Sequence, residues 1–441
     1  MKSKKRCVSD FRYDSNAARV PWAAVGEPIR EQDVAQIVRF LLKPDADKHA
    51  AYDRQFSRVE RELFKLRRVA GYAGKLTLGN SVTKLEHQMA RLLGIKHALF
   101  LTNWTAGAEI VYKYAGLKEG DEIVAPAITF IATIAYPLAV GAKVVLADVD
   151  PRTLNLDPAD VARKITRRTK VIVPVHLGGY PADMDPILKL ARRHDITVFE
   201  DDAHAFGASY KGRMCGAIGD FGAFSFHEVK NVTSLGEGGM LCTNLPFGKQ
   251  LPMARFLGLD FSRQIPDWLY DVTAIQGKTG WFAAGNHSAT EIQAIALTQQ
   301  LARLRRIIAK RRRAAHYLNR RLAHAHGLVT PPLDDRHITS SHHLYLLQVD
   351  PDKLGADVQA LKKKLAERGL VQIPHFAPLY KFSVMRQLGY NTRALEASCP
   401  VAEEAFQHRF THLPLYEYDA GQLRFMADMI IEAATELRAG R

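Results

Sequence analysis

The chain has 441 residues, of which 47% are hydrophobic and 24% are charged, which excludes a disordered, collagen-like or disulfide-stapled protein. Lysine and arginine outnumber aspartate and glutamate by 61 to 46, a formal net charge of +15 that favours anionic partners: nucleic acid, anionic lipid or phosphorylated small molecules. The four cysteines form no CxxC pair, so we predict no structural zinc, no other metal and no disulfides, and a reducing, cytoplasmic compartment.

The first 75 residues predict a helical arm with an amphipathic helix inserted between Pro44 and Ala70. Its apolar residues recur at spacings of four and three, which places them on one helix face: Tyr52, Phe56, Val59, Leu63, Leu66 and Ala70. We expect this stripe to pack on the protein itself or on a second subunit. The basic N-terminus has no apolar stretch behind it, so we expect no secretory signal.

Short β-rich runs alternate with helical stretches between about residues 85 and 243. The runs are His97–Leu101, Glu122–Ala125, Lys143–Ala147, Thr169–Pro174, Thr197–Glu200, Gly222–Phe226 and Met240–Thr243. Strands separated by crossover helices predict an α/β fold with a mostly parallel central sheet covered by helices. The longest uncharged run, residues 123–142, contains Pro126 and Pro137, so we expect strands and a helix there and not a membrane span.

A basic helical pattern follows and continues through Arg313, which predicts one long surface helix with a solvated basic face. Strand-like segments at 343–349 and 371–373 and helical segments at 354–368 and 420–437 then predict a smaller α+β domain. We therefore expect a large domain over residues 76–310 and a small C-terminal domain over 311–441.

The motif TVFEDDAHAFGA, residues 197–208, ends an apolar strand in three acids and then places His204 three residues after Asp201. The carboxyl ends of parallel strands are where open α/β sheets bind ligands. The acids taken alone are also compatible with a metal site or with a solvated sheet edge.

Two further motifs supply a lysine and a phosphate site. In residues 222–240 an apolar strand contains Ser225 near its end and is followed by Lys230 and then by a glycine-rich turn. A lysine that follows a buried strand can be a desolvated amine suited to Schiff-base chemistry. In residues 99–110 a strand leads into a helix near Thr105, where backbone N–H groups and the helix dipole favour a phosphate. Carboxylate, lysine and phosphate site together fit pyridoxal phosphate (PLP).

These motifs resemble the DegT/DnrJ/EryC1/StrS family of sugar aminotransferases, a branch of the aspartate-aminotransferase-like, fold type I PLP enzymes. The resemblance runs from about residue 20 to 430. The resembling stretches are LTLGNSVTKLE (76–86), NWTAGA (103–108), PAITFIAT (126–133), VHLGGYPADMD (175–185), EDDAHAFGA (200–208), SFHEVKN with GEGGM (225–240), GNHSATEIQA (285–294) and LPLY (413–416).

The resemblance implies catalytic roles for Lys230, as the Schiff-base lysine, and for Asp201, as the partner of the pyridine nitrogen. It implies cofactor contacts as follows: Phe130 stacks on the ring, the Trp104 backbone, Thr105 and Ser225 hold the phosphate, and His204 lies beside the cofactor. It also implies that Asn286 reaches the phosphate of the neighbouring subunit, which makes the protein an obligate homodimer with shared active sites, and that His375 can touch substrate.

Two positions depart from the family pattern. Trp104 stands where the family often has glycine, and His287 and Ser288 stand where it has a Tyr-Arg pair. The missing arginine concerns contacts to the substrate and not the binding of the cofactor.

The resemblance implies a PLP-dependent aminotransferase that converts a keto sugar, nucleotide-linked, to an amino sugar with an amino acid donor such as glutamate. Lys230 would shuttle the proton. The alternative of the same fold is a sugar dehydratase, but family members of that type carry histidine in place of the lysine. The alternative of another class, suggested by the net charge, is a regulatory or nucleic-acid-binding protein, although no nucleic-acid-binding motif supports it. We expect neither a nucleic acid nor a membrane partner.

Overall fold

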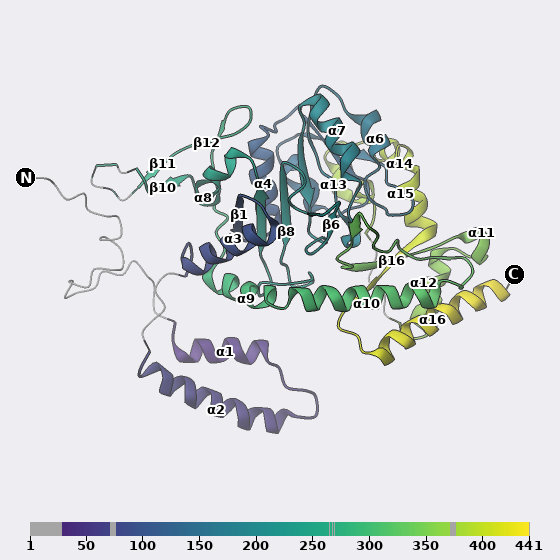
Figure 1. The fold of residues 1–441 in the computed structure, drawn as a ribbon, viewed down its shortest axis with the longest axis horizontal. Helices are drawn as coiled ribbons and strands as arrows, with labels where there is room; N and C mark the ends of the chain where they lie inside the picture. The colour runs from purple at the N-terminus through teal and green to yellow at the C-terminus, as the bar shows by residue number, and fades with distance from the viewer. Residues whose placement is uncertain are drawn as a thin grey trace, which may run out of the picture. The chain divides into compact units, whose positions relative to one another are not determined.

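The computed structural model describes residues 29–70, 76–263, 265–266, 268, 270–370 and 376–440 (Figure 1). Its contacts divide the chain into two units, one of residues 1–79 with 261–271 and one of residues 80–260 with 272–441. The second unit holds every described residue that the sequence assigns to the active site.

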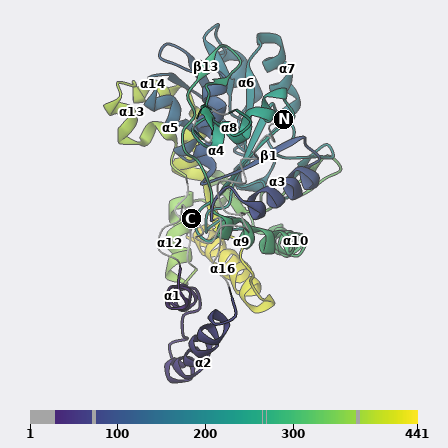
Figure 2. The ribbon, with the colours of Figure 1, turned by 90° about the vertical axis from the view of Figure 1, so that its left-hand side faces the viewer.

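The first unit contains two helices, α1 (Glu31–Leu41) and α2 (His49–Arg67), which lie side by side (Figures 1 and 2). Helix α2 lies within the predicted segment Pro44 to Ala70 and is shorter than it, and that the segment is an insertion stays a prediction. Of its apolar stripe only Phe56 is buried, stacked on Tyr52 and covered by the guanidinium of Arg39 at 4.7 Å. Val59 and Leu66 stay exposed within the chain.

The second unit is built on a seven-stranded sheet in the order β1-β9-β8-β5-β4-β2-β3. Only β9 runs antiparallel to its neighbours. All seven predicted runs form this sheet, each within two residues of its predicted bounds, so the mostly parallel α/β sheet is confirmed. The strands are β1 (His97–Leu101), β2 (Glu122–Pro126), β3 (Lys143–Ala147), β4 (Thr169–Ile172), β5 (Thr197–Asp201), β8 (Phe221–Ser225) and β9 (Gly239–Thr243).

Helices cover both faces of this sheet because its strands are apolar on both sides. Leu99 and Leu101 of β1 pack in one cluster with α4 and α5, whereas Phe100 between them packs on the opposite face with α3 and α9. Helices α6 and α7 pack over β4 and β5. The covering helices are α3 (Asn80–Leu93), α4 (Trp104–Tyr114), α5 (Ala132–Ala139), α6 (Pro158–Lys164), α7 (Met184–His194) and α9 (Glu291–Leu301).

The uncharged run at 123–142 forms β2, a loop and α5, with Pro137 inside the helix. Among the described residues, no helix combines the length and the apolar character needed to cross a membrane.

The predicted long basic helix is wrong in one respect: it is two helices, α9 and α10 (Leu304–Leu322), separated by Ala302 and Arg303. Its basic residues are also not all solvated, because Arg311 is buried. The predicted domain boundary at 310/311 falls inside α10, and the division into a large and a small domain stays a prediction.

The C-terminal part forms a three-stranded antiparallel sheet of β14 (Leu328–Val329), β16 (Leu344–Val349) and β17 (Phe410–Pro414). This sheet packs with α10, α12 (Val358–Glu367) and α16 (Ala420–Ala439) around one apolar cluster. The strand predicted at 371–373 lies outside the described residues. The remaining elements are short: α8 (Leu251–Arg255), α11 (Pro351–Leu354), α13 (Ser383–Gln387), α14 (Thr392–Ala397), α15 (Pro400–Glu404), β6 (Ser209–Tyr210), β7 (Arg213–Met214), β10 (Leu259–Asp260), β11 (Asp271–Val272), β12 (Ile275–Gln276), β13 (Trp281–Phe282) and β15 (Ile338–Thr339).

Candidate active site

A cavity of about 410 Å³, the central pocket, is built from the carboxyl ends of parallel strands and the segments that follow them. Asp201 ends β5, Ser225 ends β8, and α4 begins three residues after β1. Seven predicted site residues line this pocket together: Trp104, Thr105, Phe130, Asp201, His204, Ser225 and Lys230. Parallel strands deliver them to one place because their carboxyl ends share one edge of the sheet.

The Asp201 carboxylate is buried and hydrogen-bonded on both oxygens. The Thr133 hydroxyl donates to Oδ2 at 2.9 Å, and the Ala203 amide donates to Oδ1 at 3.2 Å. Burial raises the pKa of Asp201, while these hydrogen bonds and the charge of Lys230 oppose the shift. Asp201 forms no ion pair with any described residue, so a protonated ring nitrogen is the kind of partner that would stabilise its charged form.

Lys230 follows β8 and lines the same pocket, half-buried. Burial lowers the pKa of its amine to about 8, and the negative charge of Asp201 only partly opposes this shift. At neutral pH about a tenth of the Lys230 amine is therefore unprotonated, far more than for an ordinary lysine.

The start of α4 forms the predicted phosphate site. The Asn103 side chain caps the helix by accepting from the Ala106 amide at 2.9 Å, and Thr105 lies in the first turn, whose N–H groups have no partners within the helix. Strand β9 comes close to this turn: a Cβ on Gly239 would lie 2.2 Å from the Asn103 carbonyl oxygen and 2.7 Å from the Trp104 nitrogen. Only glycine allows this approach.

The Trp104 side chain packs away from the phosphate turn, stacked on Phe199 at 5.4 Å between ring centroids. Its backbone remains at the start of α4, where the resemblance assigns its role. Trp104 is therefore both a core residue and, through its backbone, part of the predicted phosphate site.

His204 is buried beside the pocket and stacks on His343 with ring centroids 4.5 Å apart. Its Nδ1 accepts from the Gly178 amide at 3.3 Å. Burial and the charge of Lys230 lower the pKa of both imidazoles well below its ordinary value, so the two rings are neutral at pH 7.

Three predicted residues need separate mention. Phe130 lines the pocket with 62% of its surface exposed, which leaves its ring available to a ligand. Asn286 is exposed and lies outside the pocket lining, and its Oδ1 accepts from the Ser288 amide at 3.2 Å. His375 lies outside the described residues.

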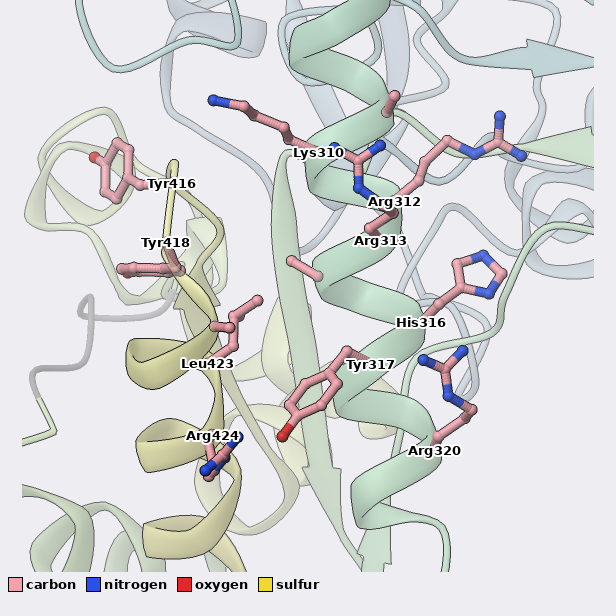
Figure 3. Close-up of a pocket in the computed structure, with 13 residues that line it drawn as sticks. Lys310, Arg312, Arg313, His316, Tyr317, Arg320, Tyr416, Tyr418, Leu423 and Arg424 are labelled. Carbon is pink, nitrogen blue, oxygen red and sulfur yellow. The ribbon is translucent and has the colours of Figure 1, made fainter.

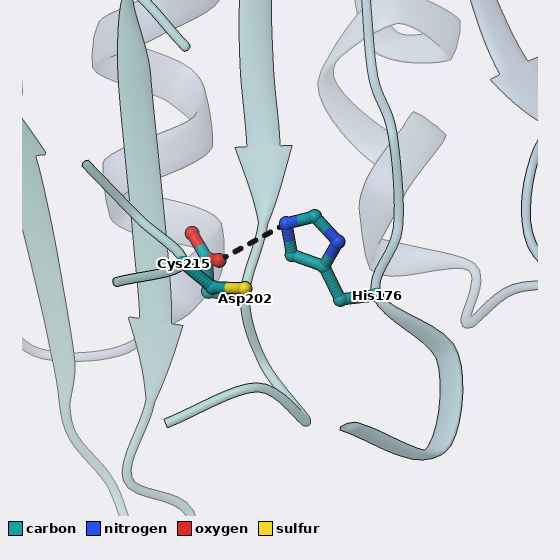
Figure 4. A group of neighbouring side chains, drawn as sticks. All are labelled: His176, Asp202 and Cys215. Carbon is teal, nitrogen blue, oxygen red and sulfur yellow. Dashed lines mark ion pairs between the residues drawn. The ribbon is translucent and has the colours of Figure 1, made fainter. Parts of the chain in front are cut away.

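The acids on either side of Asp201 are buried close to His176, and Figure 4 shows one of them, Asp202, with His176 and Cys215. His176 Nε2 lies 3.2 Å from Glu200 Oε2 and 3.4 Å from Asp202 Oδ1, near the Cys215 thiol. These side chains are close enough to hold a metal ion, but His176 Nδ1 accepts from the Ala182 amide at 2.9 Å, which keeps the proton on Nε2. We therefore assign no metal to this group and interpret it as a polar support of the strand end.

Thr133 and His343 are site residues that sequence reasoning missed. Thr133 comes from α5 and His343 from the segment before β16, so neither belongs to the strand-end motifs. Thr133 lies inside the matched stretch PAITFIAT, which was the available signal.

The sequence profile of the DegT/DnrJ/EryC1/StrS aminotransferase family matches residues 58–420. The chain is 34% identical over 381 residues to a spore coat polysaccharide biosynthesis protein, SpsC, of Bacillus subtilis, covering 83% of this chain and 92% of that protein. It is 33% identical over 364 residues to the GDP-perosamine synthase of Caulobacter vibrioides, covering 80% and 91%. The solved structure of the putative sugar aminotransferase Spr1654 of Streptococcus pneumoniae in its PMP form superposes with a TM-score of 0.73 at 25% identity, covering 83% of this chain and 94% of that one. The PLP form of that protein superposes similarly.

Fold and pocket together define a fold type I, PLP-dependent aminotransferase. The chain belongs to the DegT/DnrJ/EryC1/StrS aminotransferase family. The predicted family, fold class, enzyme class and cofactor are confirmed, and an enzyme is favoured over the nucleic-acid-binding alternative.

Proposed function

We propose that this chain is a homodimer with shared active sites that transfers an amino group from an amino acid such as glutamate to the carbonyl carbon of a nucleotide-linked keto sugar. The observation that carries the proposal is the central pocket, where Lys230, Asp201 and the start of α4 meet. The names of two relatives support a sugar acceptor, and the name GDP-perosamine synthase supports a nucleotide-linked one.

The residues of the pocket fit pyridoxal phosphate. The first turn of α4, with Thr105 and Ser225, would hold its phosphate. Phe130 would contact the face of its ring, and Asp201 would keep a proton on its ring nitrogen. When bound, the cofactor supplies an electron-accepting ring conjugated to the carbon that carries the exchanged amine.

Lys230 would then act as base and acid. Its neutral Nζ would accept a proton from the α-carbon of the donor and later return one to the sugar carbon. The neutral rings of His204 and His343 add no positive charge beside it, and the burial that lowers the pKa of Lys230 also excludes water from the proton transfer.

A second cavity, the basic pocket of about 780 Å³, is lined by residues of α10, α16 and the segment before α16, and it supports a nucleotide-linked substrate (Figure 3). Its side chains are mostly cationic or aromatic: Lys310, Arg312, Arg313, Arg320, Arg424, His316, Tyr317, Tyr416 and Tyr418. Within the described chain Lys310 pairs with Glu417 and Arg312 with Asp334, whereas Arg313, Arg320 and Arg424 form no ion pair. Such a surface suits a diphosphate and a base.

The basic pocket adjoins the catalytic region through Tyr416, which also lines a small cavity beside Lys230. In the close-up, Tyr317 of α10 extends toward Arg424 of α16, so both helices contribute to the same groove (Figure 3). A nucleotide held there would leave the sugar directed toward Lys230.

The test compares KM for a nucleotide-linked keto sugar with KM for the same sugar without its nucleotide. We expect the nucleotide to lower KM by ~10²-fold. Arg424→Gln should remove between about a tenth and all of that advantage, and it should leave KM for the free sugar unchanged. Arg305→Gln is the control, because Arg305 is an exposed arginine of α10 that lines neither cavity. Equal KM values for the two sugars would contradict the nucleotide assignment.

A further inference from the structure

Two histidines and an aspartate from separate parts of the chain meet beside α10. His316 lies on that helix, Asp334 follows β14, and His342 lies between β15 and β16. One imidazole nitrogen of each histidine and one carboxylate oxygen of the aspartate all lie within 4.8 Å of one another. None of the three residues lines the central pocket, and only His316 lines the basic pocket. The proposed reaction therefore leaves Asp334 and His342 without a role.

His342 has a buried nitrogen without a hydrogen bond. The residue is 4% exposed, and its Nε2 forms no hydrogen bond with any described residue. The nearest charged atom recorded for this nitrogen is Asp334 Oδ1, at 3.4 Å. A buried polar atom without a hydrogen bond costs free energy, so the position of this nitrogen indicates a ligand that the chain itself does not supply.

The two oxygens of Asp334 have different partners. Oδ2 pairs with Arg312 Nη2 at 2.6 Å, and Oδ1 accepts from the Ser340 amide at 2.7 Å. A carboxylate oxygen can accept at two positions, so Oδ1 keeps one for a further ligand beside His342. Contacts of this kind also orient carboxylates that bind metal ions. Arg312 and Ser340 therefore fix the carboxylate and leave Oδ1 able to bind a cation.

The chemistry and the spacing of these atoms fit Zn²⁺. Two imidazole nitrogens and one carboxylate oxygen are a ligand set that zinc accepts, with a fourth position left to water. In tetrahedral zinc, ligand atoms about 2.0–2.2 Å from the metal lie about 3.4 Å from each other. The distance between His342 Nε2 and Asp334 Oδ1 has this value. His316 is half-buried, so its ring can turn to complete the set. Mg²⁺ and Ca²⁺ prefer oxygen ligands and suit the cluster less well.

We propose that His316, Asp334 and His342 bind one Zn²⁺, which fastens α10 to the segment before β16. The proposal is independent of the donor and the acceptor of the proposed function. It departs from our expectation of no metal, because that expectation rested on the cysteines and did not consider this histidine pair.

The segment before β16 also contacts the wall of the central pocket. Ser340 Oγ donates to the Gly179 carbonyl oxygen at 2.9 Å, and Ser341 Oγ donates to the His204 carbonyl oxygen at 2.6 Å. A metal ion bound one or two residues further along would stabilise this wall without touching the reacting atoms. We therefore expect the metal to affect the stability of the protein and not the chemistry of the reaction.

The test uses tag-free, PLP-loaded protein that is dialysed against a chelator and returned to phosphate-free buffer. Calorimetry with Zn²⁺ should show one site per chain that is at least about tenfold tighter than any other, and Mg²⁺ should not occupy it. With free Zn²⁺ at about a hundred times the Kd, the melting temperature should rise by about 4 °C. Co²⁺ in place of Zn²⁺ should give the visible absorption of a four-coordinate ion.

Three variants assign the ligands. His316→Gln and His342→Gln each remove one nitrogen ligand, so each should weaken Zn²⁺ binding by ~10²-fold or more and abolish the rise in melting temperature. His337→Gln is the matched control, because His337 is an exposed histidine of the same segment that is not part of the cluster. The control should bind Zn²⁺ within about twofold of the wild type. If His342→Gln does not fold, the half-buried His316 carries the test.

Two results would overturn the proposal. A tight Zn²⁺ site that both histidine variants keep would place the metal elsewhere in the chain. A wild-type protein with no tight site, whose melting temperature is the same before and after zinc is added, would show that Asp334 and His342 form only an ion pair. Neither readout involves a donor or a sugar, so a failure of the proposed function would leave both outcomes as they are.

Discussion

At the scale of single residues, the chemistry depends on two oppositely charged groups that share one desolvated pocket. Burial raises the pKa of Asp201 and lowers that of Lys230, and the attraction between the two side chains only partly offsets both shifts. A PLP site needs both groups: an amine that can be unprotonated and a carboxylate that can pair with a cation.

The first prediction concerns the pH dependence of Lys230. A lysine reacts with an aldehyde only as the neutral amine, and the neutral fraction rises as pH passes the pKa. With a pKa of about 8, the rate at which cofactor-free protein attaches PLP covalently should rise from pH 6.5 and level off above about 8.5. Stopped-flow absorbance gives the rate, and borohydride reduction with peptide mapping identifies the lysine. A rate still rising tenfold per pH unit at pH 10, or another labelled lysine, would contradict the assignment.

The second prediction separates Asp201 from its neighbour. Asp201→Asn keeps the shape but removes the charge, so we expect turnover to fall by ~10²-fold or more. Asp202→Asn is the matched control, because it makes the same change in the neighbouring residue, which does not line the central pocket. Steady-state kinetics on both variants decides the matter. Normal turnover in Asp201→Asn, or a larger loss in Asp202→Asn, would transfer the role to the second aspartate.

At the scale of elements, the cofactor site depends on how closely β9 approaches the start of α4. We predict that Gly239→Ala weakens PLP binding by about 10–100-fold, because the added Cβ would collide with the backbone at Asn103 and force the phosphate turn apart. Gly107→Ala in α4 is the control: its Cβ would meet neighbours only at 3.5 Å and beyond, and alanine favours a helix. Absorbance titration with PLP measures both. Equal affinities for the two variants would show that the approach of β9 does not shape the site.

The central sheet could be predicted from the sequence because each strand is a short apolar run between polar breaks. The break between α9 and α10 could not, since Ala302 and Arg303 are both good helix formers and neither glycine nor proline marks it. The helix break therefore depends on tertiary packing. The same holds for Arg311, which lies in a run of basic residues and is buried only because α10 packs against β16 and α16.

Most of the candidate site could be predicted because parallel strands bring their carboxyl ends together. Asp201, Ser225 and Thr105 each follow a predicted strand, so the topology alone places them near one another. Thr133 and His343 were missed because their positions depend on where α5 and β16 dock.

At the scale of the whole molecule, the proposal of a shared active site can be tested by mixing subunits of two variants. Asn286 lies outside the pocket of its own chain, as a residue that serves a neighbouring subunit would. Mixing Lys230→Ala with Asn286→Ala subunits should then restore about a quarter of wild-type activity, because half of the dimers are mixed and each contains one intact site. The activity of refolded mixtures measures this. If mixtures recover nothing, Asn286 acts within its own chain; an active monomer by light scattering would contradict the dimer as well.

The central claim is the transfer of an amine to a nucleotide-linked keto sugar, and one measurement tests it directly. The enzyme is incubated with nitrogen-15-labelled glutamate and a panel of nucleotide-linked keto sugars, and the sugars are analysed by mass spectrometry. The account predicts that at least one sugar gains the labelled nitrogen with wild-type enzyme and none gains it with Lys230→Ala. A sugar that loses oxygen without gaining nitrogen, as a dehydratase would produce, or label that reaches no sugar at all, would contradict it.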